Sequence, residues 1–303
     1  MDFQIRMAAF KWLEEQVMLH GDLLPRTALE KGFYFEGQRI TLVGPQGIWK
    51  PKALELPLSI TTVAGGPYDD AISSKGFLKY RYRGRDVNHR DNVGLRETMR
   101  NRTPLIYFLG IEPGRYLAEW PVFIVGDLPN ELTFHVLIGE KSTVDHHRGA
   151  EPGEASQLFN EAAEYRREYV TGQAMIRLHQ RVFRARVLTA YREQCAFCRL
   201  RHAELLDAAH IISDKEEGGE PVVPNGLSLC KIHHAAFDRS IIGVSPDYQI
   251  IVREDILHEI DGPMLKHGIQ QLHEQKIILP RNKSNWPDRE RLEERFSKFK
   301  QVG

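Results

Sequence analysis

The chain has 303 residues, of which 42% are hydrophobic, and its 41 basic and 41 acidic side chains give a formal net charge of zero at pH 7. This length predicts two domains rather than one, and the hydrophobic content is sufficient for packed cores. The neutral total excludes a protein that is basic throughout, so a surface for an acidic partner has to be sought in local patches.

The cysteine count and the lack of long apolar runs indicate the compartment. Three cysteines cannot all be paired within one chain, and the first residues carry charges where a signal peptide has an apolar core. No apolar run approaches the roughly 18 residues that cross a bilayer. We therefore expect a soluble cytoplasmic protein in a reducing environment, with no membrane partner.

Residues 3–19 predict an amphipathic helix that ends near Gly21. Its apolar side chains recur every three or four residues, at Phe3, Met7, Phe10, Leu13 and Val17. Such a helix either packs on a following sheet or begins a winged helix.

From residue 32 to residue 140 the pattern changes to short apolar runs separated by Gly, Pro, Asp and Asn, which is typical of strands. The runs cover residues 40–43, 58–63, 105–109 and 121–125. They predict a mostly β, barrel-like domain, interrupted by one helix near residues 92–100.

Residues 75–102 form a local basic stretch, with nine basic and three acidic side chains. The aromatic residues Phe77, Tyr80 and Tyr82 lie among them. Basic groups interleaved with rings suit phosphate contact combined with base stacking. The alternative is a hairpin with one solvated face.

Residues 142–155 are charged and contain glycine and a His146–His147 pair, which predicts a linker. A helical pattern follows to about residue 192, with an apolar stripe at Met175, Leu178, Val182 and Leu188. Another face of this helix carries Arg177, Arg181 and Arg184, and it either lies near a phosphate backbone or is simply solvated.

All three cysteines fall in two short pairs, Cys195-x2-Cys198 and Cys230-x2-His233. A two-residue spacing lets both side chains of a turn point at one ion. Two such pairs complete a tetrahedral Cys3His site, the arrangement typical of structural Zn2+. The alternative is three unrelated buried cysteines.

Residues 191–244 resemble the HNH endonucleases, the ββα-metal nucleases with a zinc-stapled core. Beside Cys-x2-Cys, the resemblance rests on Ala-Ala-His-Ile-Ile at residues 208–212, Pro-Asn-Gly-Leu-Ser-Leu-Cys at residues 224–230 and His-His-Ala-Ala-Phe-Asp at residues 233–238. It implies a unit of two strands and a helix that hydrolyses phosphodiester bonds.

This resemblance implies roles for three residues beside the zinc ligands. His210 would be the general base that takes a proton from water, and Asn225 would fix the loop facing it. In some members of the family the asparagine approaches the metal instead. His234 would hold a divalent cation, Mg2+ or Mn2+, on the scissile phosphate. Because His234 follows the zinc ligand His233 on a helix, the two rings point about 100° apart and can face different ions.

One departure from the family pattern concerns an acidic ligand of that cation. Many relatives place it directly before the catalytic histidine, where this chain has Ala209. Asp207 is the nearest carboxylate, and on a regular strand it lies on the face opposite to His210. We name Asp207 as the candidate second ligand.

Residues 32–140 resemble the SRA (YDG) domain, a PUA-like β-barrel that flips a modified cytosine out of the duplex. The resemblance rests on Gly-Gly-x-x-Asp-Asp at residues 65–70, Tyr-x-Gly at residues 82–84 and Asn-x-x-Leu at residues 92–95. It implies that a carboxylate reads the polar edge of the flipped base while aromatic rings stack on it. The candidate reading residues are Asp70, Tyr82, Tyr68, Arg83 and Arg85.

The Tyr-Asp-Gly signature of that family is replaced by Ala118-Glu119-Trp120-Pro121 after Tyr116. A reader of another modification, such as a phosphorothioate backbone, therefore stays open. Pro67 with Arg83 or Arg85 could supply the apolar and basic surroundings that sulfur requires.

These patterns together predict an α+β protein. An N-terminal PUA/SRA-like β-barrel with flanking helices would occupy residues 1–145, a linker and helix residues 146–180, and a ββα-metal HNH domain with structural zinc residues 181–303. The expected function is that of a modification-dependent, type IV-like restriction endonuclease. It would act as a homodimer on double-stranded DNA that carries 5-methyl- or 5-hydroxymethylcytosine. The alternatives are a phosphorothioate-dependent or non-selective HNH endonuclease, and a zinc module that binds DNA without cutting it.

Overall fold

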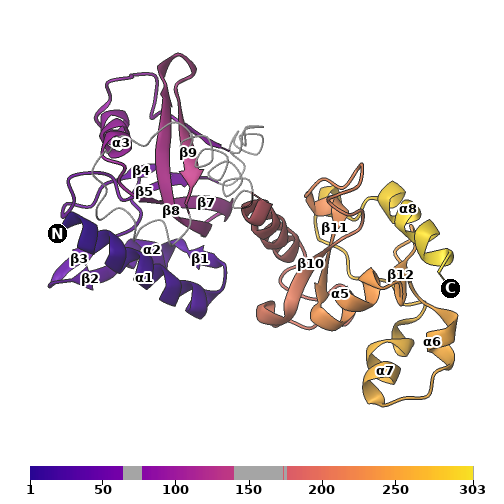
Figure 1. Ribbon diagram of the computed structural model, residues 1–303. Helices are drawn as coiled ribbons and strands as arrows, with labels where there is room; N and C mark the ends of the chain where they lie inside the picture. The colour runs from indigo at the N-terminus through magenta and orange to yellow at the C-terminus, as the bar shows by residue number, and fades with distance from the viewer. Residues whose placement is uncertain (64–76, 140–172, 174–175, 303) are drawn as a thin grey trace, which may run out of the picture. The chain divides into compact units, whose positions relative to one another are not determined.

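The computed structural model describes residues 1–63, 77–139, 173 and 176–302 (Figure 1). The chain divides into two compact units, Met1–Leu178 and His179–Gly303, and each is described by itself. None of the helices in these ranges combines the length and the apolar character of a membrane span.

The first unit is built on a seven-stranded sheet that curls into a half-barrel. The order is β4-β5-β7-β8-β9-β6, and β1 pairs with β8. β5 and β7 run parallel, while the other pairs are antiparallel. The bounds are β1 Leu23–Pro25, β4 Ile48–Trp49, β5 Ser59–Thr62, β6 Leu78–Arg81, β7 Leu105–Glu112, β8 Arg115–Leu128 and β9 Thr133–Ile138.

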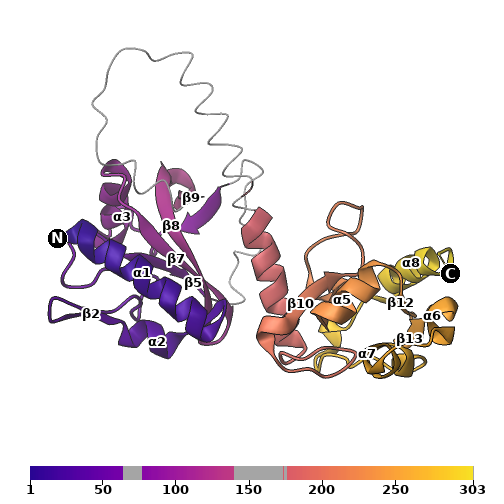
Figure 2. The same cartoon turned by 60° about the horizontal axis from the view of Figure 1, so that its bottom comes forward.

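The helix α1 (Asp2–His20) lies across one face of this sheet (Figure 2). Its buried stripe of Ile5, Ala9, Phe10 and Leu13 packs in one cluster with Ile106 and Phe108 of β7 and with Tyr116 and Ala118 of β8. The helix predicted for residues 3–19 is therefore confirmed and packs on a sheet, with Phe10 and Leu13 of the predicted stripe buried, whereas Phe3 is 39% exposed. The β7 residues Leu105 and Tyr107 are buried as well, so this strand is covered on both faces.

Arg6 of α1 is fully buried, which its charge alone would not suggest. Its guanidinium pairs with Asp2 at 2.5 Å and donates to the carbonyl oxygens of Pro57 at 2.8 Å and Pro104 at 3.0 Å. Burial lowers the pKa of Arg6, and the ion pair with Asp2 opposes that shift. The side chain thus joins α1 to two loops that are far apart in the sequence.

Two smaller features complete the first unit. The hairpin of β2 (Phe33–Phe35) and β3 (Gln38–Ile40) turns at Glu36 and Gly37, whose φ angles of 46° and 79° suit a two-residue hairpin loop. The helices are α2 (Arg26–Lys31) and α3 (Arg90–Arg100), and α3 packs beside β8. A short 3-10 helix, Pro129–Glu131, joins β8 to β9.

The expected strands are largely confirmed, since the predicted runs at 58–63, 105–109 and 121–125 lie on β5, β7 and β8, and the helix predicted near residues 92–100 is α3. The run at 40–43 leaves its strand after Ile40. There the Leu42 N–H donates to the Leu29 carbonyl at 3.0 Å, and the Leu42 carbonyl accepts from the Ser59 hydroxyl at 2.5 Å. Leu42 is buried, but its backbone bonds go to a helix and a side chain instead of a neighbouring strand. The linker predicted at 142–155 lies outside the described residues.

The second unit begins within a helix over residues 176–190. The antiparallel strands β10 (Leu206–His210) and β11 (Gly226–Cys230) follow, and α5 (Lys231–Asp238) starts directly after β11. This is the two-strand and one-helix unit that the sequence predicts. Its core joins Phe183 and Val187 of the helix over residues 176–190 to Leu227 of β11 and Phe237 of α5.

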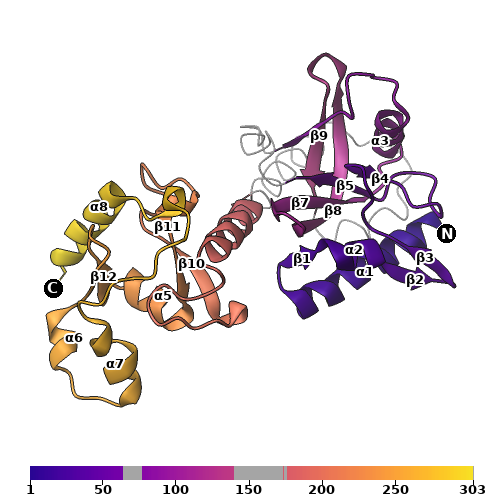
Figure 3. The ribbon, with the colours of Figure 1, turned by 180° about the vertical axis from the view of Figure 1, so that it is seen from behind.

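The rest of the second unit packs around this core (Figure 3). The hairpin of β12 (Ile242–Val244) and β13 (Ile250–Val252) lies against α8 (Arg289–Lys300), and α6 (Glu254–His258) and α7 (Pro263–Gly268) lie together at one end. Gly243 faces the Phe299 ring so closely that a Cβ there would lie 2.7 Å from it. Short 3-10 turns cover Ala203–Leu205, Val223–Asn225, Gln270–Leu272 and Lys283–Asn285.

Candidate active site

The four predicted zinc ligands come together in the second unit. Cys195 and Cys198 lie in the turn after the helix over residues 176–190. Cys230 ends β11, and His233 is in the first turn of α5. Their ligand atoms all lie within 4.8 Å of one another. His233 Nδ1 is 3.4 Å from Cys195 Sγ and 3.2 Å from Cys230 Sγ. Three sulfurs and one imidazole nitrogen at such separations are a donor set that fits Zn2+.

His233 is oriented for this cluster by its other ring nitrogen. Nε2 donates to the carbonyl oxygen of Gly268 at 2.7 Å, so Nδ1 is left for the sulfurs. Burial lowers the pKa of His233, but hydrogen bonds with Cys195 and Cys230 outweigh it and raise the pKa to about 10. Hydrogen bonds from Cys195 and Cys198 hold the pKa of the Cys230 thiol far below its usual value. Bonds with Cys195 and Cys230 raise the pKa of the Cys198 thiol instead, so Cys230 is the more readily ionised of these two thiols.

His210 ends β10, directly opposite Gly226 of β11. Its ring is half-buried and stacks on Phe183, with ring centroids 4.1 Å apart and planes 21° apart. Within the described residues, no group is within hydrogen-bonding distance of its buried Nε2. Burial lowers the pKa of His210, and the charge of His234 acts in the same direction, against Asp214 and Asp238. The imidazole is therefore held in its neutral form, as a general base requires.

Asn225 fixes the chain that follows His210. Its Oδ1 accepts from the Ile212 N–H at 2.9 Å, and its Nδ2 donates to the Ile212 carbonyl at 2.9 Å and to the Glu220 carbonyl at 3.1 Å. The Asn225 carbonyl also accepts from the Ile211 N–H at 2.9 Å. Its fully buried side chain is thus bonded to backbone.

His234 lies between two carboxylates. Its Nδ1 is 3.5 Å from Asp207 Oδ2, and its Nε2 is 3.3 Å from Asp238 Oδ2, one helical turn further along α5. The hydrogen bond with Asp207 raises the pKa of His234 against the effect of burial. His233 and His234 therefore face different surroundings, sulfur for one and carboxylate for the other.

Asp207 contacts two basic side chains in addition to His234. Its Oδ2 also accepts from Lys231 Nζ at 2.8 Å, and its Oδ1 lies 3.5 Å from Arg184 Nε. Burial raises the pKa of Asp207, but the bonds with His234 and Lys231 outweigh it and hold the pKa well below its usual value. The carboxylate stays ionised and is already engaged with cationic side chains.

Residues 195–245 match the HNH endonuclease family. They are an HNH endonuclease domain. The family consists of metal-dependent phosphodiester hydrolases. Most of the chain lies outside the matched residues, and no curated protein matches it.

Two solved structures are similar to the chain at low levels. One is the modification-dependent TagI restriction endonuclease, at 13% identity over 80% of this chain and 81% of that chain, with a TM-score of 0.29. The other is the type IV phosphorothioation-dependent restriction endonuclease ScoMcrA, at 17% identity over 59% of this chain and 49% of that chain, with a TM-score of 0.21. At these TM-scores neither likeness carries an argument about this protein.

Two contributors to the HNH domain site are absent from the sequence prediction. Phe183 lies outside the matched residues and next to the predicted stripe member Val182. Asp238 closes the matched His-His-Ala-Ala-Phe-Asp run, and its spacing of four from His234 is the signal that could have found it, because residues four apart share a helix face. Phe183 has no such signal, since its contact with His210 joins distant parts of the chain.

The DNA-reading candidates of the first unit are only partly within the described residues. Asp70 and Tyr68 lie outside them. Tyr82 is 6% exposed; its ring stacks on Phe134 at 4.5 Å between centroids, and its hydroxyl donates to the Asp127 carboxylate. The observed role of Tyr82 is core packing, which leaves no open ring face for a base at this position.

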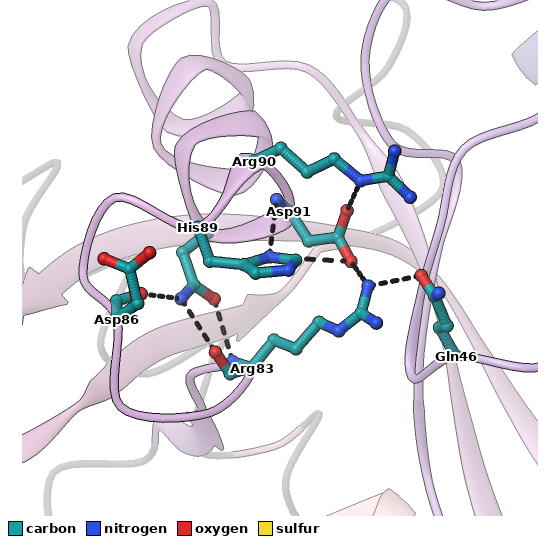
Figure 4. A network of polar contacts seen from close by, with 7 residues as sticks. Gln46, Arg83, Asp86, His89, Arg90 and Asp91 are labelled. Carbon is teal, nitrogen blue, oxygen red and sulfur yellow. Dashed lines mark hydrogen bonds and ion pairs between the residues drawn. The ribbon is translucent and has the colours of Figure 1, made fainter.

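Arg83 is held inside a polar network (Figure 4). Its Nη1 contacts the side chains of Gln46 and Asp91, and its N–H donates to Asn92 Oδ1 at 2.8 Å. Arg85 is exposed. Other basic side chains of this stretch are also paired, Lys79 with Glu131 at 3.4 Å and Arg96 with Asp127 at 2.6 Å. Much of the predicted positive charge is therefore matched locally.

Proposed function

We propose that this chain is a DNA endonuclease whose HNH domain hydrolyses phosphodiester bonds with His210, Asn225 and His234. The observation that carries the proposal is the β10–β11–α5 unit. It combines a neutral histidine, a buried asparagine that fixes the adjoining loop and a histidine between carboxylates with a separate Cys3His cluster.

In this proposal His210 takes the proton from the attacking water. Nε2 is shielded from solvent, so the proposed accepting atom is Nδ1. The lowered pKa of His210 keeps Nδ1 free of a proton near neutral pH. Asn225 acts through the backbone, because its bonds to Ile212 hold the turn directly after His210.

His234 is the proposed ligand of a divalent cation, Mg2+ or Mn2+, and Asp207 or Asp238 is the candidate carboxylate beside it. When bound, the cation supplies Lewis-acid stabilisation of the charge on the phosphoryl oxygens. Carboxylate oxygen is the kind of ligand that such hard ions prefer. Cys195, Cys198, Cys230 and His233 would hold Zn2+ as a structural staple, with no part in the chemistry.

The finer proposal concerns the choice of DNA. The sequence resemblance of residues 32–140 to SRA domains supports a PUA-like reader of 5-methyl- or 5-hydroxymethylcytosine on double-stranded DNA. Asp70 and Tyr68 remain its proposed reading residues, with Arg83 and Arg85 as phosphate contacts. A homodimer is part of this proposal, since a palindromic or double-strand cut favours two symmetry-related HNH domains, and sedimentation velocity tests it.

A digestion panel tests this choice. Plasmids that are unmodified, cytosine-methylated, hydroxymethylated or phosphorothioated are incubated with the protein and Mg2+ or Mn2+. Preferential cutting of the cytosine-modified plasmids supports the proposal, and preference for the sulfur-modified plasmid favours the phosphorothioate alternative. Equal cutting of all four contradicts modification dependence, while no cutting under any metal condition favours a zinc module that binds without turnover.

A further inference from the structure

The helix over residues 176–190 contributes directly to the surroundings of the proposed base. Phe183, Val187 and Leu188 of this helix are at most 5% exposed and belong to the core of the HNH domain. All of them precede the residues matched to the family, which begin at Cys195. The catalytic hairpin is thus closed by an element from outside the recognised domain.

The contact between this helix and the hairpin is very close at Gly226. A Cβ at this position would lie 2.5 Å from Val187 Cγ2 and 2.9 Å from Phe183 Cζ. Gly226 has an ordinary extended backbone, so a glycine is required here by lack of space rather than by its φ angle. Gly226 is also the strand partner of His210, so Phe183 covers both members of this pair.

The imidazole of His210 depends on that contact for its orientation. No described group bonds to its buried Nε2, so no hydrogen bond fixes the ring at that end. A ring at 4.1 Å and 21° from another is in stacked contact, which hinders rotation about its Cβ–Cγ bond. The charged groups that act on His210 are Asp214, in the segment after β10, and His234 and Asp238 of α5.

We infer that Phe183 is a positioning residue of the nuclease, whose ring holds the His210 imidazole in the plane from which Nδ1 meets the attacking water. This inference rests on the proposed role of His210 as general base. Phe183 also removes water from the imidazole, which contributes to the lowered pKa of His210. A catalytic group that is misplaced by about 1 Å can lose roughly 100-fold in rate.

The test compares Phe183→Leu with Val187→Ala in the full chain. Leucine keeps an apolar side chain of similar reach but removes the flat ring, while Val187→Ala loosens the same helix contact at Gly226 without touching His210. We expect Phe183→Leu to lower the single-turnover cleavage rate by roughly 10- to 100-fold. DNA affinity and zinc content should stay unchanged, and the acid limb of the pH–rate profile should move to higher pH. Val187→Ala, after correction for its folded fraction, should keep the wild-type cleavage rate and the wild-type pH–rate profile.

A second readout does not depend on cleavage. NMR titration of 13C-labelled histidine, with His210→Ala to assign the signal, should show a higher pKa for His210 in Phe183→Leu. The inference is overturned if Phe183→Leu keeps the wild-type rate and profile, or if both variants lose rate only in proportion to unfolded protein. If His210→Ala itself cuts as fast as wild type, the proposed function fails along with this inference. If His210→Ala loses cleavage as expected but Phe183→Leu has no effect on the cleavage rate, only the inference about Phe183 is overturned and the proposed function stands.

Discussion

At the scale of single residues, the neighbours His233 and His234 should fail in different ways. His233→Ala removes a ligand from the Cys3His cluster, whose atoms lie within 4.8 Å of one another, so zinc should be lost and the second unit should unfold. His234→Ala should keep zinc and fold but lose cleavage, because its ring faces Asp207 and Asp238 instead. Zinc content by atomic absorption, thermal unfolding and plasmid nicking separate the two. Identical behaviour of both variants would contradict the assignment of two sites.

The lowered pKa of His210 predicts the pH dependence of cleavage. A lowered pKa means that the imidazole stays neutral, and so able to accept a proton, below the usual histidine value of about 6.5. The single-turnover cleavage rate should therefore stay constant as the pH falls to about 6.5, and it should decline only at lower pH. An acid limb at or above that value in the wild-type protein would show that His210 is not the desolvated base described here.

Asn225 offers a prediction about stability as well as rate. Asn225→Ala leaves the backbone N–H and carbonyl of Ile212 without their partners in a fully buried place. The expected cost is roughly 1–3 kcal/mol for each such group left unsatisfied, with a fall in cleavage beyond the loss of folded protein. Urea unfolding followed at fixed zinc, together with cleavage rates corrected for the folded fraction, measures both effects. A fully active and equally stable Asn225→Ala would contradict this role.

At the scale of elements, the buried Arg6 is expected to hold α1 on the first unit. Arg6→Met removes the donor to the carbonyls of Pro57 and Pro104, at a cost of roughly 1–3 kcal/mol for a buried acceptor left unpaired. Arg39→Met is the matched control, since Arg39 also donates to two carbonyls, Lys31 and Glu30, but in exposed places where water can replace it. Denaturant unfolding of the two variants should separate them, and equal loss of stability in both would contradict the argument.

Elements also show what the sequence could predict. The spacing of Cys195, Cys198, Cys230 and His233 predicts their convergence, because each pair is local and one ion must join them. The period of α1 likewise predicts its helix, but not that Arg6 is in the buried stripe, since the carbonyls that accept from its guanidinium belong to distant loops. Tyr82 shows the same limit: its sequence pattern suggests base stacking, whereas Phe134 and Asp127 give it a place in the core.

At the scale of the whole molecule, the two units have separate cores and only the second contains the Cys3His cluster. A zinc chelator should therefore lower the unfolding temperature of the second unit and leave that of the first unchanged. Differential scanning calorimetry with and without chelator should show one transition that moves and one that does not. A single transition that shifts as a whole would mean that the units unfold together.

The measurement that tests the central claim most directly is cleavage of cytosine-modified plasmid by the wild-type protein and by His210→Ala, each with its zinc content determined. We expect the wild-type protein to cut in the presence of Mg2+ or Mn2+. His210→Ala should keep zinc and its unfolding temperature. Its cleavage rate should fall by at least about 100-fold, within the range expected for loss of a general base. Cutting by His210→Ala at the wild-type rate would contradict the account.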